Sequence, residues 1–116
     1  MIWIIGGTKD SREIFEKLTE ETDRNILVST ATEYGGKLLE EYIGKNEDGK
    51  RKLKVISERL NEEQMKKLIQ KESINLIVDA SHPYAVNVSS SAIKVTDKMN
   101  VKYIRFEREM LDYGSE

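Results

Sequence analysis

The short segment of residues 79–85, which reads DASHPYA, brings a carboxylate, a hydroxyl, an imidazole and a phenol close together. It contains His82 and Pro83, the chain's single histidine and single proline. Pro83 lacks a backbone N–H, so it fits the first turn of a helix and favours an extended backbone at His82. Because a helix N-terminus disfavours a positive charge, we expect His82 to be a neutral hydrogen-bonding group. The alternative is that His82 only caps the start of the helix.

Neighbouring side chains could share a site with His82. Ser81 and Tyr84 carry hydroxyl groups that could line the same crevice, and Asp79 could cap the helix or tie adjacent loops together. The serines at positions 89–91 are more typical of a polar helix face than of a nucleophile, because no second histidine or other evident base accompanies them.

A second candidate site lies at Gly6-Gly7-Thr8, directly after the apolar run at the N-terminus. Glycines at a strand end allow a tight turn and let an anion approach the N-terminus of the following helix. Thr8 could bond a phosphate oxygen, and Arg12 follows one helical turn later. Two glycines are weaker evidence than a full GxGxxG pattern, and an ordinary turn with Thr8 or Asp10 as the N-cap explains them equally well.

The end of the next apolar run indicates which dinucleotide would fit such a site. Domains that select NAD usually place an acid there, about 20 residues after the glycines, to bind the ribose 2′-hydroxyl. Here Ser29, Thr30, Ala31 and Thr32 occupy that place, and Glu33 lies beyond it. Hydroxyls, backbone amides and a nearby arginine favour a 2′-phosphate, although the same residues are also common strand and turn formers.

Alternating periodicities predict the elements that position these residues. Apolar runs indicate five strands, at residues 1–5, 25–29, 53–56, 74–78 and 101–106. Helical spacing separates them, with a capping box at Asn61 and Gln64. A short helix at 37–42, a solvated loop at 44–51 and a helix after Pro83 complete the pattern. This order predicts an α/β fold: one doubly wound, Rossmann-like parallel sheet of about five strands with helices on both faces.

In such a sheet, ligands bind beyond the carboxyl ends of the strands, where the strand order reverses. The loops expected to form the site follow the first, second, fourth and fifth strands. These are residues 6–10, 29–36, 79–84 and the segment from residue 107 onward.

Composition excludes several classes of function. The 116 residues include no cysteine and one histidine, which excludes disulfides, thiolate nucleophiles and multi-histidine metal sites within one chain. Charged residues make up 34% of the chain, but the net charge is −2, which argues against a nucleic-acid-binding face. No apolar run reaches the length of a membrane span, and the N-terminus lacks a basic leader. We therefore expect a soluble cytoplasmic protein without a signal peptide.

Four stretches, taken in order, resemble one family. They are GGTKDSR at 6–12, STATEYG at 29–35, DASHPYA at 79–85 and YIRFER at 103–108. Together they are similar to the precorrin-6A reductases of cobalamin biosynthesis, including the cobalt-precorrin-6A reductases of the anaerobic route. The third stretch is the most specific, because that family typically reads DATHPYA there.

The resemblance implies an NADPH-dependent enzyme that transfers a hydride to a ring carbon of a tetrapyrrole, a corrin precursor, and reduces one double bond. The family fold has two Rossmann-like domains with cofactor and substrate between them. The implied contacts fall into three groups: Gly6, Gly7 and Thr8 at the cofactor phosphates; Ser29, Thr30 and Ala31 at the adenosine end; and Ser81, His82, Pro83 and Tyr84 toward the substrate cleft. His82 could donate a proton or hold a carboxylate arm of the substrate.

The chain departs from the family in two respects. It corresponds to about the first half of a family member, so residues 1–116 would form the N-terminal domain of a two-domain enzyme whose second domain is absent, and would be inactive alone. The proline that often follows the Glu107-Arg108 pair is replaced by Glu109-Met110.

Two other functions fit the predicted fold. A stand-alone nucleotide-sensing module is the first, although the third glycine and the acid at the end of the second strand are missing. A phosphotransfer receiver-like domain is the second, but Gly6-Gly7-Thr8 stands where an acidic cluster is needed.

Overall fold

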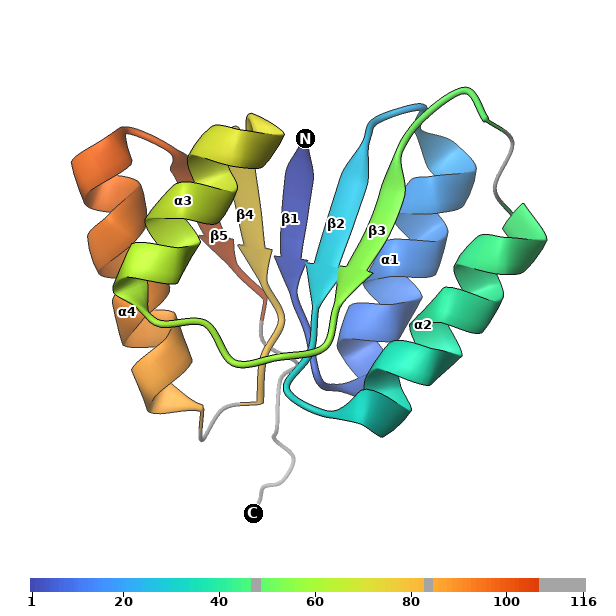
Figure 1. Ribbon diagram of the computed structural model, residues 1–116, viewed down its shortest axis with the longest axis horizontal. Helices are drawn as coiled ribbons and strands as arrows, with labels where there is room; N and C mark the ends of the chain where they lie inside the picture. Colours follow the sequence, from blue (N-terminus) through green and yellow to red (C-terminus); the bar gives the residue numbers. More distant parts are fainter. Residues whose placement is uncertain (47–48, 83–84, 107–116) are drawn as a thin grey trace, which may run out of the picture.

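The chain folds into a five-stranded parallel sheet with two helices on each face (Figure 1). The computed structural model describes residues 1–46, 49–82 and 85–106. The elements alternate strictly along the chain. They are β1 (Ile2–Ile5), α1 (Lys9–Glu21), β2 (Ile26–Ser29), α2 (Glu33–Asn46), β3 (Leu53–Ile56), α3 (Glu62–Glu72), β4 (Leu76–Asp79), α4 (Val86–Met99) and β5 (Lys102–Arg105).

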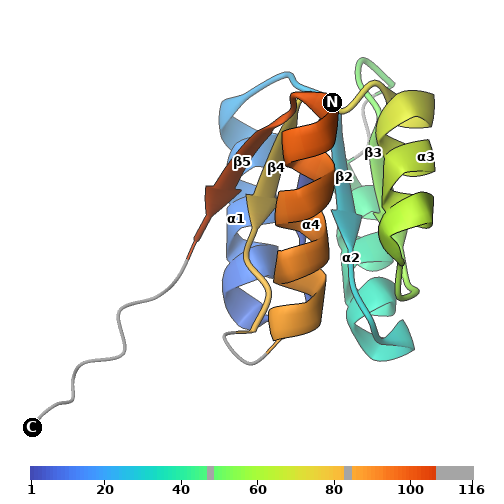
Figure 2. The ribbon, with the colours of Figure 1, turned by 90° about the vertical axis from the view of Figure 1, so that its left-hand side faces the viewer.

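The strands lie in the order β3-β2-β1-β4-β5, and every neighbouring pair is parallel. This is a doubly wound sheet whose order reverses between β1 and β4, so the predicted fold class is confirmed. β5 is an edge strand, and Figure 2 views the molecule from the side where β5 and α4 lie. The crevice expected for a ligand therefore lies beyond the carboxyl ends of β1 and β4.

Two apolar cores hold the layers together, one on each face of the sheet. On one face, Trp3 and Ile77 pack with Met65 of α3 and Val95 of α4. The opposite core joins alternate strand residues to α1 and α2; its buried members are Ile2, Ile4, Phe15, Ile26, Val28, Leu39 and Leu53. β1 is buried along its whole length because it contributes to both cores, which explains why its sequence is continuously apolar.

Side-chain caps fix the starts of two helices. The side chain of Asn61 accepts a hydrogen bond from the backbone N–H of Gln64, and the Gln64 side chain accepts one from the backbone N–H of Asn61. These two bonds confirm the predicted capping box. Thr8 and Ser11 form the equivalent arrangement at the start of α1. Of the two N-caps considered for this helix, Thr8 is the one observed.

The region after β2 differs from the prediction. α2 begins at Glu33 and ends at Asn46, so it is longer than the predicted helix at 37–42 and includes part of the predicted loop at 44–51. Gly36 lies inside the helix because its first turn packs closely against the chain after β3. A Cβ atom at Gly36 would lie 1.8 Å from Ser57 Oγ, so glycine is required by packing here rather than by a turn.

Across residues 1–46, 49–82 and 85–106, no helix combines the length and apolar character needed to cross a membrane. Over the same ranges, no group of three or more metal-ligating side chains is close enough to hold a metal ion.

Candidate functional site

Three loops leave the carboxyl edge of the sheet side by side. Ile5 at the end of β1 is in register with Ser29 on β2 and Asp79 on β4. The chain stays paired just past these ends, because Gly6 N donates to Ser29 O at 2.7 Å and Ala80 N donates to Ile5 O at 2.9 Å. Three of the four predicted segments therefore begin at one level and face a common space. The fourth, from residue 107 onward, lies outside the described residues, so that prediction stays a prediction.

That space is a cleft of about 530 Å³ between the sheet edge and the first turns of α3 and α4. Its floor and one wall are apolar, formed by Trp3, Ile5, Leu60, Met65 and Val88. The rest of its lining is polar, with hydroxyl, amide and charged side chains contributed by the loops and by α4: Ser29, Thr30, Thr32, Glu58, Arg59, Ser81, His82, Asn87 and Ser91. An apolar floor with a few polar groups around it is typical of small-molecule sites.

Most of the predicted residues line this cleft. The set is Gly6, Gly7, Ser29, Thr30, Ala31, Ser81 and His82. Thr8 and Arg12 lie instead along a smaller groove beside it, together with Lys9 and Tyr34. The cleft and the groove share Gly7, Thr30 and Thr32, so a ligand that crosses this boundary could contact both.

The two glycines differ in what they require. Gly7 has a φ of +109° and is exposed, with no atom within 4 Å of where a Cβ would stand. A non-glycine residue would be strained there, and the open space leaves the backbone accessible to a ligand. A Cβ at Gly6 would instead lie 2.9 Å from both Ser11 Oγ and Ser29 O, so Gly6 lets β1 and α1 approach β2.

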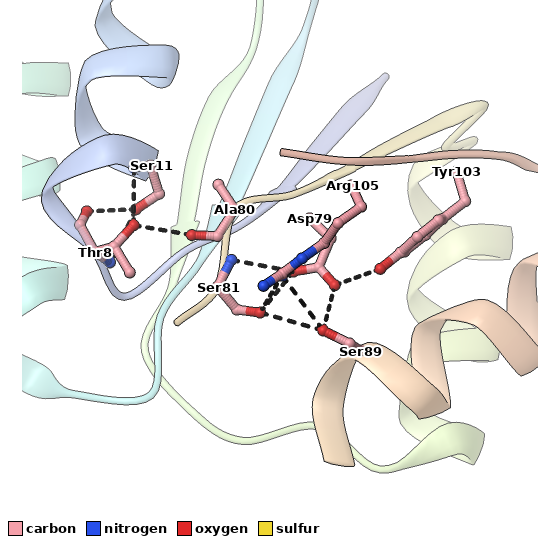
Figure 3. Close-up of polar contacts among 8 residues, drawn as sticks. All are labelled: Thr8, Ser11, Asp79, Ala80, Ser81, Ser89, Tyr103 and Arg105. Carbon is pink, nitrogen blue, oxygen red and sulfur yellow. Dashed lines mark hydrogen bonds and ion pairs between the residues drawn. The ribbon is translucent and has the colours of Figure 1, made fainter. Parts of the chain in front are cut away.

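Thr8 ties the loop after β1 to the loop after β4. Its Oγ1 accepts from Ser11 N at 3.0 Å and donates to Ala80 O at 2.8 Å (Figure 3). A hydroxyl has one hydrogen to donate. Donation from Thr8 Oγ1 to a phosphate oxygen would therefore require the bond to Ala80 to break.

The residues at the end of β2 divide into buried and exposed positions. Ser29 is buried, and its Oγ accepts a hydrogen bond from Trp3 Nε1 at 2.9 Å. Thr30 is also buried, whereas Ala31 and Thr32 are exposed. Ser29 thus fixes the tryptophan of the cleft floor, and the next residues present backbone and hydroxyl groups to the cleft.

Asp79 is the centre of a hydrogen-bond network at the end of β4 (Figure 3). Its Oδ1 accepts from Ser81 N at 3.1 Å, from Ser81 Oγ at 2.7 Å and from Arg105 Nη1 at 3.0 Å. Its Oδ2 accepts from Ser89 Oγ at 2.6 Å and from Tyr103 Oη at 2.5 Å. The side chain is 0% exposed, so these bonds replace the water that a carboxylate would otherwise bind.

The network favours the charged form of this carboxylate. Burial alone would raise the pKa of Asp79, but the hydrogen bonds from Ser89, Tyr103 and Ser81 outweigh burial and lower the pKa below its ordinary value. Burial, followed by the hydrogen bond to Asp79, raises the pKa of the Tyr103 phenol well above its ordinary value. Asp79 is therefore ionised and Tyr103 neutral near pH 7.

The segment that carries His82 is described in part. Ser81 is buried beside Asp79, and His82 is exposed at the cleft. Pro83 and Tyr84 lie outside the described residues, so the predictions for them stay predictions. The described geometry agrees with the idea that Asp79 ties loops together, rather than with its use as a cap for α4.

Several residues of the site were not predicted. Ser89 was interpreted as part of a polar helix face, yet its hydroxyl bonds Asp79. Tyr103 and Arg105 were assigned no role in the site, and the loop after β3 was not expected to line the cleft. The alternation along β5 was the available signal, because Tyr103 and Arg105 share one face of that strand, which is the face toward Asp79.

Comparison with known proteins gives a consistent picture. The family model described as "Precorrin-6x reductase CbiJ/CobK" matches residues 1–116. A cobalt-precorrin-6A reductase of Methanocaldococcus jannaschii is 44% identical over 106 residues, which cover 91% of this chain and 39% of that relative. One from Methanococcus maripaludis is 33% identical over 108 residues, with 92% and 40% covered. The chain thus spans well under half the length of these relatives.

A solved structure supports the fold. The structure described as "CobK precorrin-6A reductase" superposes on this chain with a TM-score of 0.72 at 18% identity, and the match covers 97% of this chain and 39% of that one. At this level of identity the likeness concerns the arrangement of the sheet and helices.

Proposed function

The chain belongs to the precorrin-6x reductase family, and on that premise we propose that it forms the N-terminal, dinucleotide-binding part of an enzyme that reduces precorrin-6A or cobalt-precorrin-6A with NADPH. The observation that carries this proposal is the cleft at the switch point of the sheet, which is lined by Gly7, Ser29 and His82 together. In doubly wound sheets this is the place where dinucleotides bind.

The residues present fit the cofactor. Gly7 offers an accessible backbone next to the N-terminus of α1, which suits a pyrophosphate. The apolar floor around Leu60 and Met65 suits a flat aromatic ring such as adenine. The neighbouring groove contains Lys9 and Arg12, two cations that suit a 2′-phosphate, and no acid stands at the end of β2.

NADPH supplies the hydride when it is bound, and the residues of this chain supply binding and orientation. His82 lines the cleft, where it would orient the nicotinamide or a carboxylate arm of the substrate. The rest of the substrate cleft would come from a C-terminal domain that corresponds to the remaining length of the relatives.

Binding of the cofactor can be measured directly on this chain. Trp3 is the single tryptophan and lies at the cleft floor, so its fluorescence reports on ligands there. We expect NADPH to quench Trp3 emission in a saturable way and to bind more tightly than NADH. A preference for NADH or ATP would contradict the proposal and favour a nucleotide-sensing module.

Arg12→Ala tests the assignment of the 2′-phosphate. Loss of one charge-assisted phosphate contact should weaken NADPH by about tenfold and leave NADH nearly unchanged. Lys17→Ala, on the same helix but exposed and away from the groove, is the matched control. Equal losses for NADPH and NADH in Arg12→Ala would exclude this role for Arg12.

A further inference from the structure

The hydrogen bonds of Asp79 join four separate segments at one point beside the cleft. Through Ser81 the carboxylate reaches the cleft loop, defined here as residues 80–82; through Ser89 it reaches α4; and through Tyr103 and Arg105 it reaches β5. Asp79 itself is the last residue of β4. The carboxylate does not line the cleft, so its contacts act on the residues that do.

The cleft loop is held from both sides. On one side, Thr8 Oγ1 donates to Ala80 O, which attaches the loop to the turn that contains Gly7. On the other side, both the amide and the hydroxyl of Ser81 donate to Asp79. The loop therefore has a fixed position between the phosphate-side turn and the network, and His82 follows immediately.

The network also fixes which way the hydroxyl hydrogens point. A carboxylate can only accept, so Ser81, Ser89 and Tyr103 each give their hydroxyl hydrogen to Asp79. Arg105 Nη1 donates to Ser81 Oγ at 3.0 Å as well as to Asp79. Ser81 thus has no hydroxyl hydrogen left to donate to a ligand, although it lines the cleft.

From these contacts we propose that Asp79 is the positioning residue of the dinucleotide cleft: its hydrogen bonds hold the cleft loop in the conformation that binds the cofactor. Ser81 then acts as a link between Asp79 and the loop rather than as a donor to the ligand. This inference rests on the proposed function for the identity of its ligand, but the position of the loop can be measured without any ligand.

A second buried carboxylate provides a matched control. Glu72, at the end of α3, is ion-paired with Lys52 and Lys54 and is also nearly inaccessible to solvent. It lies at the opposite end of the sheet from the cleft, because α3 runs antiparallel to the strands and Lys52 precedes β3. Glu72→Gln removes a buried charge without touching the cleft loop.

The first experiment needs no ligand. Amide hydrogen exchange by NMR should show that the Ser81 N–H is protected in the wild-type chain and exchanges at least about tenfold faster in Asp79→Asn. The ring resonance of Tyr103 should also titrate at lower pH in Asp79→Asn, because the charge that opposes phenolate formation is gone. Glu72→Gln should change neither signal. Unchanged Ser81 exchange in Asp79→Asn would overturn the proposal.

The second experiment measures NADPH affinity by Trp3 quenching in the same proteins. Asp79→Asn should weaken NADPH by about tenfold, and Glu72→Gln by less than about twofold, even where both lower the melting temperature. Equal losses in the two variants would show that only stability matters and would overturn the proposal. If the wild-type chain does not bind NADPH at all, the proposed cofactor is wrong, whereas the Ser81 exchange still decides the role of Asp79.

Should Asp79→Asn fail to fold, milder variants give the same decision. Ser89→Ala removes one donor from Asp79, and Ser89→Thr keeps the hydroxyl. The proposal expects weaker NADPH binding and faster Ser81 exchange in Ser89→Ala, with recovery of both in Ser89→Thr. Ser89→Ala with wild-type values for both measurements would contradict it.

Discussion

Two buried carboxylates stand at opposite ends of the same sheet and are neutralised in different ways. Glu72, at the amino-terminal edge, is 4% exposed and pairs with Lys52 and Lys54, which are 60% and 39% exposed. Asp79, at the carboxyl-terminal edge, is 0% exposed and is bonded by three hydroxyls, one amide and Arg105. Flexible lysines need only charge proximity, whereas the donors to Asp79 need fixed directions.

The two edges of the sheet differ in the kind of bond that holds their buried carboxylate. At the amino-terminal edge, an ion pair between buried Glu72 and partly exposed Lys54 joins α3 to β3, away from the cleft. At the carboxyl-terminal edge, the donors come from segments far apart in sequence and fix a loop that lines the cleft. Directional bonds are placed where position matters for binding, and simple charge pairing is placed where it does not.

Removing each carboxylate should change the free energy of unfolding by very different amounts. Asp79→Ala removes the acceptor of three hydroxyls and the carboxylate that pairs with Arg105, so we expect a loss of about 3–5 kcal/mol in the free energy of unfolding. Glu72→Ala leaves lysines that solvent can reach, so the expected loss is about 1 kcal/mol. Urea denaturation of both variants measures the difference. Losses of equal size would remove the contrast.

Two glycines of α2 provide a second contrast between the same edges. Gly36→Ala, at the cleft end of the helix, should destabilise by about 1–3 kcal/mol, because the new Cβ overlaps Ser57. Gly44→Ala, near the other end, meets nothing within 4 Å and should stabilise the helix by about 0.5–1 kcal/mol. Thermal unfolding of the two variants measures both changes in stability. Relief of the Gly36→Ala loss by Ser57→Gly would identify the overlap as its cause.

Acid should affect the two carboxylates in sequence. The folded chain lowers the pKa of Glu72, chiefly through its hydrogen bond to Lys54, and that of Asp79, where hydrogen bonds from Ser89 and others outweigh burial. A carboxyl group whose pKa is lowered by folding stabilises the folded state at any pH above its ordinary pKa. This contribution is lost as the pH falls from the ordinary pKa through the pKa of the folded state. The ordinary values are 4.5 for Glu72 and 3.8 for Asp79, so the loss at Glu72 starts at higher pH.

Stability measured between about pH 5 and pH 3 checks this order. Glu72→Gln should flatten the upper part of the curve, and Asp79→Asn should flatten the lower part. A curve that keeps its wild-type shape in both variants would show that other groups control acid unfolding.

The smallest expected effect is the response to salt. About 1 M NaCl should reduce the contribution of Glu72 by a few tenths of a kcal/mol, because its lysines are exposed. The contribution of Asp79 should stay constant, because Arg105 is only 24% exposed. Urea titrations of wild type, Glu72→Gln and Asp79→Asn at low and high salt give this difference. A larger salt response at Asp79 would mean that solvent reaches its network.

The sequence allowed much of the fold to be predicted and only part of the site. Apolar runs and alternation located all five strands of the described residues, and the doubly wound topology followed from their order. Gly7, Ser29 and His82 were expected in one crevice because parallel strands end at the same edge, and they line one cleft. These are consequences of local pattern and of a general rule of topology.

The remainder depends on contacts that no local pattern shows. Tyr103 and Arg105 lie 24 and 26 residues from Asp79 in the sequence, and only the pairing of β4 with β5 brings them together. α2 was predicted too short because two glycines usually interrupt a helix, whereas close packing against Ser57 requires Gly36 inside this one. The direction of the Thr8 hydroxyl likewise became evident only with the position of Ala80.

An NMR titration of the labelled chain with NADPH tests the location of the dinucleotide site most directly. We expect the backbone amide shifts to concentrate at Gly7, Ala31 and His82, all at the carboxyl-terminal edge, and the amides of Lys54 and Glu72 to stay unchanged. Shifts centred on Lys54 and Glu72, with none at Gly7 and His82, would contradict this expectation.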